Sequence, residues 1–146
     1  MSSTKILEAD QIERKLQRIA RQILEDFHDV SDLHFVTIAG NGEPVGLRLA
    51  RILQEISTTR VHASTVTLNK QAPLSQEIHI TTPLSTFKDQ QVVIIDDVLN
   101  SGKTLMYAVH HILSAGPSRV ATAVLVDRIH RSFPIRADYC GLSLST

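Results

Sequence analysis

The chain has 146 residues, of which 42% are hydrophobic and 21% are charged. These values are typical of one globular domain with a sizeable core. It carries 15 basic and 15 acidic residues, so its formal net charge is zero. Bulk electrostatic attraction to nucleic acid or to a membrane surface therefore gets no support from the composition.

The cysteine content and the apolar runs indicate a cytoplasmic protein. A single cysteine, Cys140, provides no disulfide framework and is typical of a reducing compartment; we expect it to be a small buried side chain. The polar N-terminus differs from a signal peptide, and the longest apolar run, residues 120–126, is too short to span a bilayer. We expect one domain over residues 1–146, without membrane contact.

Residues 8–28 are predicted to form an amphipathic helix. Apolar side chains recur at helical spacing, at Ile12, Leu16, Ile19, Ile23 and Phe27. Asp10 is the predicted N-cap, and Glu13 completes a capping-box pair with it. Another face carries three arginines, interpreted as a solvated basic face with anion or RNA contact as the alternative: Arg14, Arg18 and Arg21.

The rest of the chain alternates between strand and helix patterns. Strands are predicted at residues 34–39, 61–68, 77–82, 92–95, 119–126 and, as one or two short pieces, 137–144. Helices are predicted at residues 45–56 and 102–115, and exposed loops at 69–75 and 127–136. This alternation predicts an α/β fold, an open and mostly parallel twisted sheet with helices on both faces.

The most informative stretch is residues 92–104, with the sequence VVIIDDVLNSGKT. Its β-branched run is typical of a central parallel strand buried on both faces, and ligands of such sheets bind beyond the carboxyl ends of the strands. Asp96 and Asp97 fall at that end. Adjacent side chains there point in different directions and need not compete for ionisation. Their carboxylates suit the hydroxyls of a ribose or a divalent metal.

The loop that follows, residues 99–104, is predicted to bind an anion. It offers backbone N–H groups and two hydroxyls at the start of a helix, where the helix dipole also favours negative charge. A Walker A loop is excluded, because the first glycine of that motif would fall at Asp97.

Other signals are weaker. Three glycines approach a dinucleotide-binding pattern, but Gly46, the third, is displaced by one position. The seven histidines include no pair spaced as metal ligands on one helix face. A basic cluster is interpreted as an ordinary loop near an anionic ligand, with RNA or subunit contact as alternatives: Arg128, His130, Arg131 and Arg136.

Residues 92–104 resemble the signature for phosphoribosyl pyrophosphate (PRPP) in type I phosphoribosyltransferases. Residues 125–141, LVDRIHRSFPIRADYCG, and the early helix QIERKLQRIARQILE resemble the pyrimidine-operon attenuation regulators, which have uracil phosphoribosyltransferase activity. The resemblance covers nearly the whole chain. It implies the type I phosphoribosyltransferase fold, PRPP as the donor, and Mg²⁺ bound mainly through PRPP oxygens, with Asp96 as a candidate direct contact.

The resemblance also implies roles for individual residues. Asp96 and Asp97 would hold the ribose hydroxyls and, with Lys70 in a mobile loop at residues 67–80, are the candidate catalytic residues. The implied substrate-binding residues, first of a pyrophosphate loop and then of a 5′-phosphate loop, are Ala39, Gly40, Asn41, Gly42, Asn100, Ser101, Gly102, Lys103 and Thr104. The resemblance further implies the family's chemistry, in which pyrophosphate is displaced at the anomeric carbon through an oxocarbenium-like transition state that positioning and charge stabilise.

The chain departs from the family pattern at four places. The pyrophosphate loop has no basic residue and adds Glu43, which weakens pyrophosphate binding. Lys70 is the only positive charge that the mobile loop can supply. Asn100 stands where purine-using relatives often have an aspartate, which makes a purine a less expected substrate. The sequence stops at Thr146, so we expect a base pocket that is open, borrowed from a partner, or completed by further natural sequence.

Two functions are therefore expected. The first is Mg²⁺-dependent transfer of ribose 5-phosphate from PRPP to a nucleobase, a pyrimidine such as uracil, in nucleotide salvage. The alternative is a nucleotide-sensing regulator that binds RNA or a protein partner, with Arg128, Arg131 and Arg136 as candidate contacts. The family resemblance implies a homo-oligomer, expected to be a dimer.

Overall fold

The structure is a computed structural model that describes residues 8–145. Over these residues, six strands form one sheet in the order β3-β2-β1-β4-β5-β6. Neighbouring strands pair in parallel, except that β3 runs antiparallel to β2. The elements are α1 (Ala9–Asp26), β1 (Asp32–Ile38), α2 (Gly42–Ile56), β2 (Arg60–Thr67), η1 (Pro73–Ser75), β3 (His79–Ile80), η2 (Leu84–Phe87), β4 (Gln91–Leu99), α3 (Lys103–Leu113), β5 (Arg119–Asp127) and β6 (Tyr139–Ser143).

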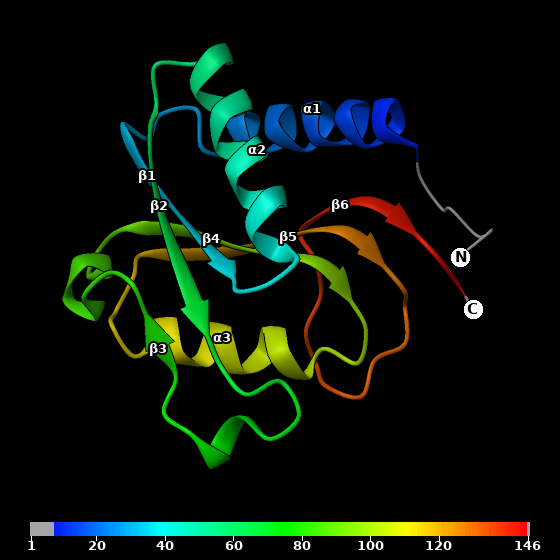
Figure 1. The fold of residues 1–146 in the computed structure, drawn as a ribbon. Helices are drawn as coiled ribbons and strands as arrows, with labels where there is room; N and C mark the ends of the chain where they lie inside the picture. Colours follow the sequence, from blue (N-terminus) through cyan, green and yellow to red (C-terminus); the bar gives the residue numbers. More distant parts are fainter. Residues whose placement is uncertain (1–7, 146) are drawn as a thin grey trace.

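Helices cover both faces of this sheet (Figure 1). α1 and α2 pack on one face, where their apolar side chains join Val93 and Ile95 of β4. α3 packs on the other face, against Val92 and Ile94. Successive residues of β4 thus point into opposite cores, as the pleat of a strand requires. The predicted fold class, an open and mostly parallel α/β sheet with helices on both faces, is confirmed.

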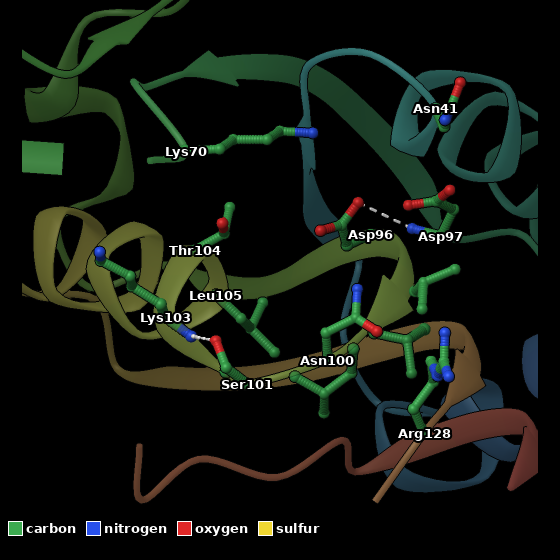
Figure 2. A pocket seen from close by; sticks show the side chains of 14 residues that line it. Asn41, Lys70, Asp96, Asp97, Asn100, Ser101, Lys103, Thr104, Leu105 and Arg128 are labelled. Atoms are coloured by element: carbon green, nitrogen blue, oxygen red, sulfur yellow. Dashed lines mark hydrogen bonds between the residues drawn. The ribbon is translucent and has the colours of Figure 1, made fainter. Parts of the chain in front are cut away.

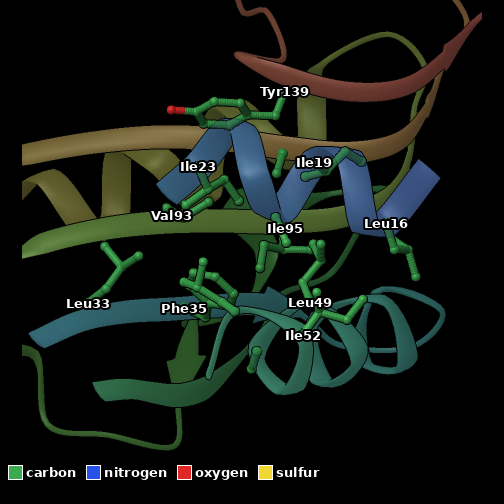
Figure 3. Packing of buried hydrophobic residues seen from close by; sticks show 14 of the residues in the cluster. Leu16, Ile19, Ile23, Leu33, Phe35, Leu49, Ile52, Val93, Ile95 and Tyr139 are labelled. Atoms are coloured by element: carbon green, nitrogen blue, oxygen red, sulfur yellow. The ribbon is translucent and has the colours of Figure 1, made fainter. Parts of the chain in front are cut away.

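The predicted apolar stripe fixes where α1 docks. Leu16, Ile19 and Ile23 are at most 1% exposed and pack in one cluster with residues of α2 and the sheet (Figure 3). Burying side chains of this size stabilises the fold by about 1.5–3 kcal/mol each. An ion pair between Arg48 and Glu13 also joins α2 to α1.

The predicted N-cap of this helix is wrong, although the helix begins within one residue of its predicted start. Glu8, and not Asp10, is the N-cap, and its side chain forms a capping box with Gln11. Asp10 lies in the first turn instead, where its charge suits the helix dipole, and it pairs with Arg14 at 3.4 Å.

The basic face of α1 is only partly solvated. Arg18 donates hydrogen bonds to the backbone carbonyls of Cys140 and Gly141, at 3.2 and 2.7 Å, and so ties α1 to the edge strand β6. Cys140 is partly buried against the α3 cluster, rather than fully buried as expected.

The central strand is longer than predicted. β4 continues past Ile95 through both acids to Leu99, because its pairing with β5 persists to the Leu99–Asp127 partners. Asp96 and Asp97 therefore belong to the strand itself, and the turn toward α3 comes after them.

Smaller differences concern the ends of other elements. α2 begins at Gly42 rather than at residue 45, and α3 ends at Leu113 rather than at residue 115. Residues 137–144 contribute one strand, β6, while the predicted short returning strand is β3. Within residues 8–145, no helix combines the length and the apolar character that crossing a membrane requires.

Candidate active site

A cavity of about 370 Å³ lies where β4 ends and α3 begins (Figure 2). Most of the predicted site residues line it, together with apolar side chains and one arginine. The lining residues are Asn41, Lys70, Asp96, Asp97, Val98, Leu99, Asn100, Ser101, Gly102, Lys103, Thr104, Leu105, Val124 and Arg128. The position is that of ligand sites in open parallel sheets, at the carboxyl ends of the strands.

The acid pair shapes the electrostatics of this cavity. Asp96 is 6% exposed and accepts a hydrogen bond from the Asp97 backbone N–H at 2.8 Å. Burial, and then a hydrogen bond with the Asp97 side chain, raises the pKa of Asp96 from its ordinary 3.8 to about 7. The expectation that the two carboxyls need not compete for ionisation is therefore wrong. Once ionised, both offer oxygen atoms of the kind that hydroxyls and divalent cations take.

The loop of residues 39–42 approaches the acids with its backbone. A Cβ atom added to Gly42 would lie 3.1 Å from Asp96 Oδ1, so the absence of a side chain permits this approach. Gly40 has a φ of +98°, the left-handed region that glycine adopts readily. Asn41 lines the cavity, while the Ala39 N–H extends the sheet by donating to Val66 O at 2.9 Å.

Lys70 is brought to the cavity by the loop between β2 and β3. Its side chain extends across the cavity in Figure 2, and its Nζ lies 3.6 Å from where a Cβ of Gly40 would be. Asn69 stabilises the loop, because its Oδ1 accepts the N–H groups of Gln71 and Ala72 at 3.1 and 3.0 Å. Lys103 holds the loop from the other side, donating from Nζ to the Gln71 carbonyl at 2.9 Å.

The loop of residues 100–104 forms the N-terminal end of α3. Gly102 is the N-cap with a φ of +91°, and the Ser101 Oγ accepts the Lys103 N–H at 3.3 Å. This turn points backbone N–H groups and the positive end of an 11-residue helix toward the cavity.

A later segment covers this loop. The Ser101 carbonyl accepts hydrogen bonds from the N–H groups of Ser132 and Phe133, at 2.9 and 3.1 Å. A Cβ atom on Gly102 would lie 2.4 Å from Ile135 Cγ2, so only glycine fits under the segment.

The basic cluster divides into residues with different surroundings. Arg128 lines the cavity, and its N–H donates to Leu99 O at 3.0 Å. Arg131 instead folds back, donating to Asp127 Oδ2 at 2.7 Å and to the Ile135 carbonyl at 2.8 Å. Arg136 is exposed, with its Nε 3.4 Å from an oxygen of Asp138.

Arg128 was predicted to lie in a basic loop near an anionic ligand, with RNA or partner contact as the alternative, but it was not among the predicted substrate-binding residues. The sequence contained a signal for this position, because Arg128 directly follows β5, and β5 was a predicted strand of the same, mostly parallel sheet. Val98, Leu105 and Val124 were missed, since apolar residues beside a predicted core are not distinguishable from it by pattern.

Comparison with known proteins defines the class. A family model described as phosphoribosyl transferase domain matches residues 2–145, and the chain belongs to this family. Within it, the chain is similar to proteins named Bifunctional protein PyrR. It is 36% identical to that of a Roseiflexus species over 100% of this chain and 84% of the relative, and 34% identical to that of Clostridium acetobutylicum over 97% and 84%. The predicted family and the phosphoribosyltransferase assignment are thereby confirmed.

Solved structures with low sequence identity share the fold. The hypoxanthine phosphoribosyltransferase of Trypanosoma cruzi superposes with a TM-score of 0.84 at 20% identity, covering 95% of this chain and 80% of that one. A hypoxanthine-guanine phosphoribosyltransferase from Bacillus anthracis gives 0.78 at 17% identity, with the same two coverages. These likenesses concern the arrangement of the backbone, so the base that this chain uses has to be argued from its own residues.

Proposed function

We propose that this protein transfers ribose 5-phosphate from PRPP to a pyrimidine base, uracil, to form the nucleoside monophosphate. One observation carries the proposal: the acid pair, the 100–104 loop and the 39–42 loop meet around a single cavity of about 370 Å³. The uracil assignment is supported by the likeness to the PyrR proteins and by Asn100 in place of the aspartate of purine-using relatives.

Each group of residues around the cavity has a binding role in this proposal. The N–H groups of residues 100–104 bind the 5′-phosphate, and Asp96 and Asp97 accept hydrogen bonds from the ribose hydroxyls. The base is placed against Val98 and Val124, beside Arg128, which can donate to a base carbonyl. Lys70 supplies positive charge at the pyrophosphate end.

The transfer replaces one bond at the anomeric carbon by another. The bond to the pyrophosphate oxygen breaks, a bond to the base nitrogen forms, and the proton of that nitrogen is released. The chain contributes by holding the two reactants in line and by placing Lys70 where negative charge grows on the departing oxygen. Mg²⁺ would neutralise part of the pyrophosphate charge when bound, and the oxygen donors of Asp96 and Asp97 fit that ion.

The alternative is a nucleotide-sensing regulator. The observation that favours it is the exposed Arg136, next to the segment whose N–H groups bind the Ser101 carbonyl. A partner or an RNA that contacts Arg136 would thus be separated from the phosphate loop, residues 100–104, only by the segment that contains Ser132 and Phe133. Both proposals include a homodimer, which the family resemblance supports. Both also include a cytoplasmic location, which the single cysteine supports.

Turnover tests the enzyme proposal directly. The protein is incubated with PRPP, Mg²⁺ and a panel of bases, and released pyrophosphate is measured; uracil should give release. Asp97→Asn should lower the rate by roughly a hundredfold or more, the usual effect of removing a group that positions or stabilises the reacting sugar. Asp29→Asn, an exposed acid outside the cavity, is the matched control and should retain the rate.

A negative result separates the two functions. Absence of pyrophosphate release with every base contradicts the enzyme proposal, and calorimetry with UMP then tests the regulator. If UMP binds, RNA affinity should weaken steeply as salt rises and should fall in Arg136→Met. If UMP does not bind at millimolar concentration, the regulator is also refuted.

A further inference from the structure

The loop of residues 39–42, which the proposed function takes as the pyrophosphate end of the site, is held by a carboxylate of the protein's own. Glu43 Oε2 accepts the backbone N–H of Gly40 at 2.9 Å, and the Glu43 N–H returns a hydrogen bond to the Gly40 carbonyl at 3.2 Å. Glu43 is exposed, in the first turn of α2. Asn41 is the N-cap of α2, so the Glu43 side chain satisfies a backbone donor one residue before the N-cap, as the glutamate of a capping box does for the N-cap itself.

That backbone donor lies in the loop that also provides Asn41 to the cavity lining. Gly40 approaches Lys70 Nζ, Gly42 approaches Asp96, and Asn41 lines the cavity. Residues 39–46, AGNGEPVG, contain no lysine or arginine that would offset the charge of Glu43. An anionic group arriving at this loop must therefore displace a carboxylate from the Gly40 N–H and approach a like charge.

The phosphate loop at the other end of the cavity contains no acidic side chain that could compete with an anionic ligand for its N–H groups. Residues 98–104, VLNSGKT, contain no acid and form a helix N-terminus. A single phosphate on the ribose 5′-oxygen meets only this end, whereas PRPP must satisfy both ends at once.

From this asymmetry we propose that Glu43 is a specificity-determining residue, which makes the site bind ribose 5-monophosphates, the class that includes nucleoside monophosphates, in preference to PRPP. The inference rests on the proposed function, because it takes the 39–42 loop as the pyrophosphate end. PRPP enters when the Glu43 side chain leaves the Gly40 N–H, a movement that its exposure permits.

Two substitutions separate the effect of the Glu43 charge from that of its hydrogen bond with the Gly40 N–H. Glu43→Gln removes the charge but keeps an oxygen that can accept the Gly40 N–H, since glutamine also serves in capping boxes. Glu43→Ala removes both and releases the N–H for a ligand. Glu55→Gln makes the same charge change on an exposed residue of the last turn of α2 and is the matched control.

The ligands form a matched pair as well. Ribose 5-phosphate and PRPP differ only in the anomeric pyrophosphate, and the affinity of each is measured by calorimetry in the presence of Mg²⁺. We expect Glu43→Ala to bind PRPP on the order of tenfold more tightly than the natural sequence, the equivalent of one like-charge contact removed, and Glu43→Gln to show part of this gain. Ribose 5-phosphate affinity should stay within about twofold in both variants, and Glu55→Gln should change neither.

The possible results decide between the claims. If PRPP affinity is the same in all three variants as in the natural sequence, or if both ligands tighten together, Glu43 does not select between them and the inference is overturned. If neither ligand binds to any form while thermal unfolding shows folded protein, the proposed function itself is refuted, independently of Glu43.

Discussion

Replacing Asp96 by asparagine should stabilise the folded protein, and increasingly so as the pH rises. Asp96 is 6% exposed, and burial with the neighbouring Asp97 carboxyl raises its pKa to about 7. Ionising this group in the folded state is therefore costly. Asparagine has nearly the same shape, keeps an oxygen that can accept the Asp97 N–H, and carries no charge at any pH.

The size and the direction of the effect follow from linkage. The difference between the ordinary pKa of 3.8 and a folded value of about 7 corresponds to about 4 kcal/mol. Between these two pH values the folded state holds a proton that the unfolded state has released. The stability of the natural sequence therefore falls by that amount as the pH rises from about 4 to about 7, and is then level. Asp96→Asn lacks this decline.

Urea unfolding at several pH values measures the difference. Subtracting the curve of the natural sequence from that of Asp96→Asn cancels the contributions of titrating groups that do not interact with Asp96, and leaves the titration of the Asp96–Asp97 pair. The advantage of the variant should grow by about 4 kcal/mol between pH 4 and pH 8. An advantage that is constant with pH would refute the reasoning, because it would mean that Asp96 ionises as easily in the folded chain as in the unfolded one.

Two further substitutions test the packing around the site. Gly46→Ala would place a Cβ 1.8 Å from Thr37 Cγ2 and should destabilise the fold by about 1–3 kcal/mol in urea unfolding. Adding Thr37→Ser, which removes that methyl group, should restore much of the lost stability. Unchanged stability of Gly46→Ala alone would contradict the contact. Arg131→Met leaves the Asp127 carboxylate without its ion pair and should cost about 1–3 kcal/mol while weakening ribose 5-phosphate binding. The exposed Arg136→Met should change the free energy of unfolding by no more than about 0.5 kcal/mol, and equal effects of the two substitutions would contradict a stabilising role of the Arg131–Asp127 ion pair.

Much of the fold was predictable because periodicity reports burial. The continuous apolar run at residues 92–95 identified the central strand, and the spacing of Leu16, Ile19 and Ile23 identified the packed face of α1. The extension of β4 to Leu99 was not predictable in this way. Aspartates are disfavoured in strands, and here pairing with β5 overrides the local preference.

The site was predictable where its residues are contiguous in sequence. Asp96, Asp97 and residues 100–104 are brought together by one strand and one turn, which a local pattern can indicate. The approach of Lys70 and Gly40 depended on the family resemblance, because it requires the arrangement of separate loops. The inward fold of Arg131 was not predictable, since its partners Asp127 and Ile135 meet it only through the shape of the loop.

The two hydrogen bonds that the Ser101 carbonyl accepts have a thermodynamic consequence. They make the shape of the phosphate loop depend on Ser132 and Phe133, in a segment that also carries exposed side chains to the surface. Any macromolecule that displaces this segment must change the affinity for a phosphorylated ligand. By reciprocity, occupancy of the phosphate loop then changes the affinity for that macromolecule by the same factor. Binding of a macromolecule outside the cavity and binding of a ligand inside it would thus change each other's affinity without direct contact between the two.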